Sequence, residues 1–215
     1  IVYLDEFQLE NFNVLLTGTE NEVGGVVTGG GYVSDLFGNI YFETKVDVES
    51  FMLNNYYVGD IALKNAWDNT NKKISFEGSL KEYLMRTLRF AGDYYVQKED
   101  DNVNISLRLD ETNLDWLQGI LPPEVSNFQG VATGDLTLTG DFGDSKIDGI
   151  VRLYDAGVRV NMLNTYYRFS GDITMDSEYG MISLDYIKII DQNGKQSYAN
   201  GTFFKENFKD FNFDI

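Results

Sequence analysis

Most of the chain alternates apolar and polar residues, and this period-two pattern is typical of β-strands with one apolar and one polar face. The stretch VATGDLTLTG, residues 131–140, is an example, because Ala132, Leu136 and Leu138 alternate with Thr and Asp. The 21 glycines recur between such stretches, where the chain would turn. The sequence therefore predicts an all-β protein, built as an elongated, curled and antiparallel meander of strands.

The apolar positions of the predicted strands would share one face of this sheet, since alternate residues of a strand point to the same side. We predict that this face is lined by Ile74, Phe76, Ile105, Leu107, Leu109, Ala132, Leu136, Leu138, Ile147, Val151, Leu153, Val158, Val160, Met162, Tyr167, Phe169, Ile173, Ile182, Leu184 and Phe203. The intervening positions, such as Arg152, Arg159 and Asp172, would lie on the opposite, polar face.

Two local signals refine the strand pattern. The stretch MISLDYIKII, residues 181–190, begins with Ile182 and Leu184 in phase and continues with Ile187 and Ile189 one position out of phase. This change of phase predicts a β-bulge. The dipeptide Asn193-Gly194 that follows predicts a hairpin turn.

Helical patterns are few. Residues 110–125, DETNLDWLQGILPPEV, place Leu114, Leu117 and Ile120 at helical spacing and end at a Pro pair, which predicts one short helix. Residues 79–90, SLKEYLMRTLRF, also show helical spacing, but a strand is an equally open interpretation of their second half. We therefore expect one or two short helices.

Several segments occur twice. MLNNYYVGDI begins at residue 52 and MLNTYYRFSGDI at residue 162, and the GDI triplets within them begin at residues 59 and 171. GVVTGGG at residue 25 resembles GVATGDL at residue 130, and SFEGSLKEY at residues 75–83 resembles YANGTFFKEN at residues 198–207. The similarities keep the same order in the two halves, which indicates a duplicated meander that stacks into one continuous sheet.

The repeat predicts an organisation in four parts. Residues 1–19 would be an incoming strand of a longer sheet, and residues 20–110 would form the first copy of the meander. Residues 111–126 would hold the short helix and the Pro-Pro connector, and residues 127–215 would form the second copy. We expect the chain to be a piece of a longer protein.

The charge of the chain excludes several classes of partner. There are 34 acidic and 17 basic residues, giving a formal charge of −17. Such a chain repels polyphosphates, so we expect no nucleic acid partner, and it adheres poorly to anionic lipid headgroups. Any membrane-related function would therefore depend on apolar surface.

The composition also argues against catalysis. With no Cys and no His, zinc sites of the usual kind, thiol nucleophiles and Ser-His-Asp triads are excluded. Acidic clusters at residues 99–101 and at Asp141, Asp144 and Asp148 leave a carboxylate pair or calcium site open, but solvated turn residues are the simpler interpretation. We expect no enzymatic activity, no cofactor and no metal.

Two architectures can accommodate the apolar faces. In a closed β-sandwich they pack against each other, and the protein would then be an extracellular module that binds glycan or protein. In an open, curled sheet they line a groove, and so large an apolar patch is costly unless something apolar fills it.

The ordered motifs of residues 114–215 favour the open groove. Leu121-Pro122 is followed by Gly130, Gly134, Gly140, an acidic turn and Gly149, and then by LNTYY, GDI at residues 171–173, the hairpin at residues 191–194 and Gly201. This series resembles the C-terminal domain of the TamB family, the translocation and assembly module subunit. Residues 20–110 resemble the same domain more loosely, and the family's Pro after the acidic turn is absent here.

The resemblance implies a fold, a function and a location. TamB-like proteins are long curled β-sheets, called β-tacos, with an apolar lumen. They are anchored in the inner membrane by an N-terminal helix, which would lie outside this chain, and they span the periplasm of diderm bacteria. The resemblance therefore implies a conduit for phospholipid toward the outer membrane. It also implies an outer-membrane barrel partner of the TamA/BamA kind and a role in outer-membrane protein assembly.

Overall fold

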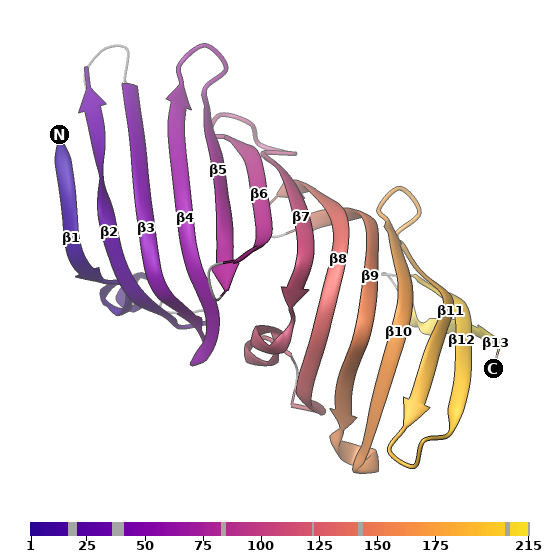
Figure 1. Cartoon of the computed structure of the whole chain (residues 1–215). Coiled ribbons are helices and arrows are strands. Elements are labelled where there is room, and N and C mark those ends of the chain that lie inside the picture. Colours follow the sequence, from indigo (N-terminus) through magenta and orange to yellow (C-terminus); the bar gives the residue numbers. More distant parts are fainter. Residues whose placement is uncertain are drawn as a thin grey trace. The chain divides into compact units, whose positions relative to one another are not determined.

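The computed structural model describes residues 1–16, 21–35, 41–82, 85–121, 123–141, 144–204 and 207–214, with side chains described except at residues 15–16, 85–86, 144, 203–204 and 207–214. Strands dominate these residues (Figure 1). They are β1 (Val2–Gln8), β2 (Val23–Ser34), β3 (Tyr41–Leu53), β4 (Tyr56–Asp68), β5 (Lys73–Glu82), β6 (Met85–Tyr95), β7 (Val103–Asn113), β8 (Val125–Asp141), β9 (Asp144–Val160), β10 (Thr165–Asp176), β11 (Met181–Asp191), β12 (Gln196–Phe204) and β13 (Asn207–Asp214). Three 3-10 helices interrupt them: η1 (Leu9–Leu16), η2 (Asp115–Gly119) and η3 (Asn161–Leu163).

The strands form a single sheet in which each strand is hydrogen-bonded to its neighbours in sequence. The pairs from β1 to β6 and from β9 to β13 are all antiparallel. This confirms the all-β, meandering antiparallel fold. The alternative of a closed sandwich is wrong, because a sandwich needs two packed sheets and these strands belong to one.

The chain divides into two compact units. Unit 1 consists of residues 1–107 and 138–145, and unit 2 consists of residues 108–137 and 146–215. Strands β1 to β6 belong to unit 1 and strands β10 to β13 to unit 2, while β7, β8 and β9 contribute residues to both. Each unit is considered separately below.

Bulges recur in the strands of both units. In unit 1 the register shifts in β1 between Leu4 and Phe7 and in β3 between Val48 and Phe51. In unit 2 it shifts next to Asp155 in β9 and next to Tyr186 in β11. A bulge bends its strand and increases the local twist, so these positions are where the strands of each unit curve. The bulge predicted in β11 is confirmed.

The bulge residues recur in the same order as the repeated sequence. Glu6 and Ser50 have φ values of 49° and 52°, and Glu111 and Asp155, each 105 residues further on, have 53° and 45°. The glycines of the repeat behave alike, with 134° at Gly25 and 127° at Gly130. GVVTGGG and GVATGDL therefore lie on β2 and β8, and the two GDI triplets lie on β4 and β10, so that each pair is six places apart in the sheet order.

The similar segments SFEGSLKEY and YANGTFFKEN are not structurally equivalent. The described part of SFEGSLKEY, residues 75–82, lies on β5, and YANGTFFKEN begins on β12, seven strands further along. In an antiparallel meander an odd number of strands reverses the direction of the chain, so the two segments cannot occupy the same place in a repeated unit. This similarity is therefore local.

Three local predictions have different outcomes. The predicted helix at residues 110–120 is the single 3-10 turn η2, preceded by Leu114 and without a side-chain cap. The helical interpretation of residues 79–90 is wrong, because the described part of this stretch lies on β5 and β6. The expectation of one strand over residues 1–19 is wrong for residues 9–16, which form η1, and residues 17–19 lie outside the described residues.

The hairpin predicted at Asn193-Gly194 is confirmed between β11 and β12. The Asp191 side chain accepts hydrogen bonds from the backbone N–H groups of Asn193 and Lys195, at 2.8 Å each. Gly194 has a φ of 81°, which a residue with a side chain rarely adopts.

Candidate functional site: the apolar face of the sheet

In unit 1 the strand register places apolar side chains in continuous rows across six strands. One row runs through Phe7, Val27, Val48, Ile61, Leu80 and Leu88, from β1 to β6. A neighbouring row runs through Leu4, Gly29, Val46, Leu63, Gly78 and Phe90. Directly paired residues of antiparallel strands share a face, so these rows define one apolar face. The predicted residues Ile74 and Phe76 lie on it, paired with Trp67 and Asn65.

Unit 2 carries an equivalent face. Val151 pairs with Ile173, which pairs with Leu184, and Ala156 pairs with Phe169, which pairs with Ile189. Gly149, Met175, Ile182 and Phe203 form a further row, of which the Phe203 side chain lies outside the described residues. The apolar residues of β9 to β12 thus share one side of the sheet.

The bulges keep these side chains on the same face. Leu153 and Val158 are five residues apart, so a regular strand would place them on opposite sides. The bulge at Asp155 adds one residue, and β10 pairs Gly171 with Leu153 and Tyr167 with Val158. The same device at Tyr186 brings Leu184 and Ile187 to one face of β11. The predicted lining residues Leu153 and Val158 therefore face the same way, and Ile187 joins the predicted Leu184.

Few of the described side chains are fully buried, although the face is apolar. The buried apolar residues are Val27, Val58, Leu80, Val103, Leu114, Ala132, Val151, Leu153, Ala156, Ile187 and Ala199. Many of the other apolar side chains are half-buried, and some, such as Ile147 at 40%, are exposed.

The deepest burial in unit 2 is a cluster beneath η2. Leu114, Ala132, Val151, Leu153 and Ala156 form its buried centre. Leu109, Leu117, Phe128, Leu136, Phe169 and Ile173 pack around this centre. Seven of the predicted lining residues therefore meet in one place: Leu109, Ala132, Leu136, Val151, Leu153, Phe169 and Ile173.

The opposite face of the same strands is polar. In unit 2, Arg152 forms an ion pair with Asp172, with 2.5 Å between Nε and Oδ1, and Arg168 forms one with Asp155 at 3.1 Å. The Arg152 guanidinium holds the pKa of Asp172 below its ordinary value. Both pairs are substantially exposed, so their contribution to stability is small.

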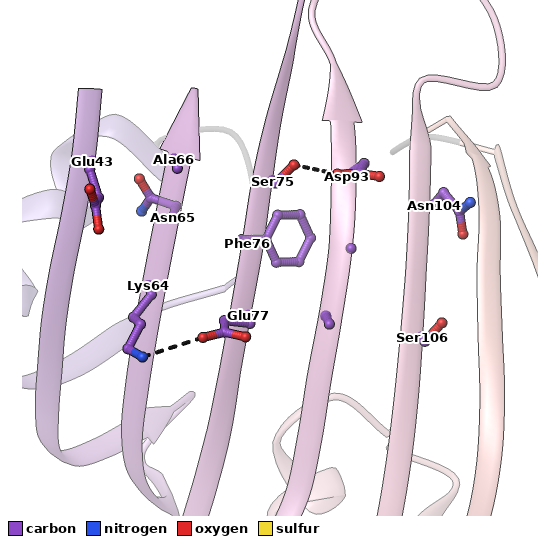
Figure 2. A pocket seen from close by; sticks show the side chains of 12 residues that line it. Glu43, Lys64, Asn65, Ala66, Ser75, Phe76, Glu77, Asp93, Asn104 and Ser106 are labelled. Carbon is purple, nitrogen blue, oxygen red and sulfur yellow. Dashed lines mark hydrogen bonds and ion pairs between the residues drawn. The ribbon is translucent and has the colours of Figure 1, made fainter. Parts of the chain in front are cut away.

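In unit 1 the polar residues surround a shallow depression of about 660 Å³ (Figure 2). Its lining includes the small residues Ala66, Ala91 and Gly92, and Glu43 and Asn104 stand at its sides. Figure 2 shows two side-chain pairs across neighbouring strands, Lys64 with Glu77 at 3.4 Å and Ser75 with Asp93 at 2.6 Å. Lys64 and Glu77 pair with each other, and Asp93 is bonded to Ser75 and Lys73, so this depression is a weaker candidate site than the apolar face.

The acidic residues considered from the sequence serve the backbone and its turns. Asp148 accepts hydrogen bonds from the hydroxyl and the backbone N–H of Ser177, and these bonds lower its pKa. Asp141 Oδ1 accepts the N–H of Asn102 at 3.4 Å, while the side chain of Asp144 lies outside the described residues. Within the part of the chain that the structure describes, no three carboxylates gather as a metal site would need.

One predicted lining residue is misplaced. Met162 was expected on a strand, pointing into the apolar face like Met52, but it lies in η3 and is 86% exposed. Met52 and Leu53 lie at the end of β3, so the two Met-Leu-Asn words differ in secondary structure. The Asn residues that follow are alike, because Asn54 and Asn164 have φ values of 50° and 48° and both lead into the next strand. The repeated Met-Leu-Asn motif therefore specifies a turn.

The other predicted residues occupy alternate positions of their strands. Ile105 and Leu107 lie on β7, Leu138 on β8, and Ile147 and Val160 on β9; Ile147 is 40% exposed. The sequence reasoning missed Ala156 and Ala199, both buried on the apolar face. Small residues carry little periodic signal, and only the bulge beside Ala156 brings it into phase.

Comparisons with known proteins found no matching family model, no matching curated protein and no matching solved structure. No helix among the described residues is long and apolar enough to cross a bilayer.

Proposed function

We propose that the apolar face holds the acyl chains of phospholipids, and that the protein is a TamB-like lipid conduit in the periplasm of a diderm bacterium. The observation that supports this is the single layer of strands with continuous apolar rows in each unit. No second sheet covers these rows among the described residues. Apolar surface of this extent is costly in water and is usually occupied.

The magnitudes suit transport along the sheet. Each buried methylene contributes about 0.8 kcal/mol, so a chain of ~16 carbons lying mostly on the face would be held by about 10 kcal/mol. Escape into water would be slow. Movement along the rows exchanges one contact for an equivalent one, so it would meet little resistance, and the headgroup would remain in solvent. The mechanism requires no nucleophile, metal or cofactor.

The partners and the location in this proposal come from the resemblance of residues 114–215 to the TamB family. They are an inner-membrane anchor outside this chain and an outer-membrane barrel of the TamA/BamA kind. Assistance in barrel assembly is part of the same proposal. The strongly acidic composition supports recognition of the lipid through its acyl chains.

Intrinsic fluorescence offers a direct test, because the chain has two Trp residues. Trp67 lies on the apolar face of unit 1, paired with Ile74 and stacked on Phe42 with 6.1 Å between ring centroids. In a Trp116→Phe variant, stearate brominated in the middle of its chain should quench Trp67. Unbrominated stearate should bind without quenching.

A matched control uses the other face of the same strand. Lys64 is exposed on the polar side of β4, so a Lys64→Trp variant lacking both natural Trp residues should keep its fluorescence with the brominated probe. Equal quenching at positions 64 and 67 would indicate nonspecific association. An unquenched Trp67 in a protein that self-associates would mean that a second copy covers the face, and the lipid proposal would be wrong.

A further inference from the structure

We propose that the segment Leu114–Gly119, which includes η2, is a displaceable strap that occupies the acyl-chain position of unit 2 until lipid arrives. The inference deepens the proposed function and rests on it. An acyl chain would then have to compete with the leucine side chains of the strap for the same part of the apolar face of unit 2.

The burial of the leucines carries the inference. Leu114 is 5% exposed and lies with Leu117 against the apolar face at Ala132, Leu153 and Ala156. The face is unusually low here, because Ala132 and Ala156 have short side chains and Gly130, facing Ala156, has none. The chain thus places two leucines against short side chains of its own apolar face, where an acyl chain would make the same contacts.

The attachment of the strap is compatible with release. It is a single 3-10 turn without a side-chain cap. Its bonds to β8 include Leu114 N–H to the Gly130 carbonyl at 2.9 Å and Phe128 N–H to Gln118 Oε1 at 3.0 Å. Trp116 carries an indole N–H that is buried without an acceptor, which is an unfavourable arrangement that release would relieve. Thr112, 1% exposed, marks the fixed end of the segment.

In unit 1 the corresponding segment, η1, covers the apolar face less than η2 does in unit 2. Segment η1 follows β1 as η2 follows β7, and Phe12 contacts Phe7 with 5.2 Å between ring centroids. Phe12 is nevertheless 44% exposed and Val14 68% exposed. The described part of η1 therefore covers its face less closely than Leu114 and Leu117 cover theirs.

Trp116 reports the state of the strap. In a Trp67→Phe variant of the whole chain, stearate should shift the Trp116 emission to the red, because displacement moves the indole into water. A second variant, Phe169→Trp in a chain lacking both natural Trp residues, places a Trp on the apolar face of unit 2. Brominated stearate should quench this Trp. The quenching and the red shift of Trp116 should saturate at the same stearate concentration.

One substitution within the segment and one at the residue that follows it separate a strap from a fixed core. Leu117→Ala removes part of the competing surface and should lower the stearate concentration for half-saturation several-fold, whereas Ile120→Ala, at a 52% exposed position, should leave it unchanged. Quenching at Phe169→Trp with unchanged Trp116 emission would overturn the strap alone. Weaker binding by Leu117→Ala, with its secondary structure intact by circular dichroism, would also overturn it. Absence of quenching at both Trp67 and Phe169→Trp would overturn the proposed function and the strap together.

Discussion

The segments β2–β4 and β8–β10 share their backbone irregularities but differ in how they pack. Both contain a glycine near φ 130°, a bulge residue in the left-handed region and a left-handed Asn before the third strand. Beneath η2, however, unit 2 builds a buried cluster, whereas the buried residues Val27 and Leu80 of unit 1 lie three strands apart, on β2 and β5. The repeated sequence therefore specifies where the chain bends and turns, and each unit fills its apolar face with different side chains.

Gly130 offers the strongest test of whether the shared backbone conformation of β2–β4 and β8–β10 matters for stability. A Cβ there would overlap the Ala156 backbone, and the φ of 127° is poorly accessible to other residues. We expect Gly130→Ala to lower the free energy of unfolding by about 4 kcal/mol. Gly180→Ala is the control, because Gly180 also has a positive φ, of 59°, but meets nothing within 4 Å, so its cost should be about 1 kcal/mol. Equal costs in urea denaturation would show that space at Gly130 is not limiting.

Because the two units differ in side-chain packing, we expect truncations at corresponding positions to lower the free energy of unfolding by different amounts. Leu153 is 7% exposed within the cluster of unit 2, while Val48, 105 residues earlier, lies half-buried on the face of unit 1. Leu153→Ala should cost about 3 kcal/mol and Val48→Ala about 1 kcal/mol. Similar losses by chemical denaturation would mean that the two units are packed alike.

Adjacent positions on β11 test whether the two faces differ in lipid binding. Leu184 lies on the apolar face, paired with Ile173, and Asp185 on the polar face, paired with Asp172. Leu184→Asn should weaken stearate binding about tenfold, because part of the buried apolar contact is lost. Asp185→Asn should leave binding unchanged, and calorimetric titration of both folded variants would measure the difference. Unchanged binding by Leu184→Asn would place the ligand elsewhere.

The repeated residues Asn54 and Asn164 should differ modestly in their contribution to the free energy of unfolding. Asn54 Oδ1 accepts the backbone N–H of Glu22 at 2.7 Å, whereas Asn164 Oδ1 accepts a side-chain donor, Arg159, at 2.6 Å. Both lose a favourable left-handed residue on mutation to Ala. We expect about 1 kcal/mol for Asn54→Ala and about 0.5 kcal/mol for Asn164→Ala, since satisfying a backbone donor contributes more. Thermal unfolding would detect the order, and the reverse order would contradict it.

The smallest expected effect is a pH dependence in unit 1. Burial alone would raise the pKa of Asp93, but hydrogen bonds from Ser75 and Lys73 outweigh it and lower the pKa below 3.8. A lowered folded pKa means that the stabilisation is present above the unfolded value and is lost as the pH falls through the folded value. Asp93→Asn should therefore cost about 0.5 kcal/mol at neutral pH and progressively less below pH ~4. A difference that grows on acidification would contradict this assignment.

Much of the fold follows from the sequence because strand alternation is a local property. The apolar and polar positions of Val151 to Leu153, and of Ile182 to Leu184, already state which residues share a face. The phase change before Ile187 and the Asn193-Gly194 turn are equally local, and both are confirmed. Helical spacing at residues 79–90 misled, because Leu80 and Leu88 also pair directly across β5 and β6.

The sequence by itself determined the alternating faces, the turns and the order of the strands, because side-chain periodicity and left-handed glycine and asparagine positions act within a few residues. Leu153 and Val158 were already predicted to share a face, but only the tertiary structure showed that Ala156 joins them, since the bulge at Asp155 is defined by pairing with β10. It also decided that Met162 is exposed and that Leu114 and Leu117 lie on the apolar face. Those outcomes depend on contacts between residues distant in sequence, to which no local pattern is sensitive.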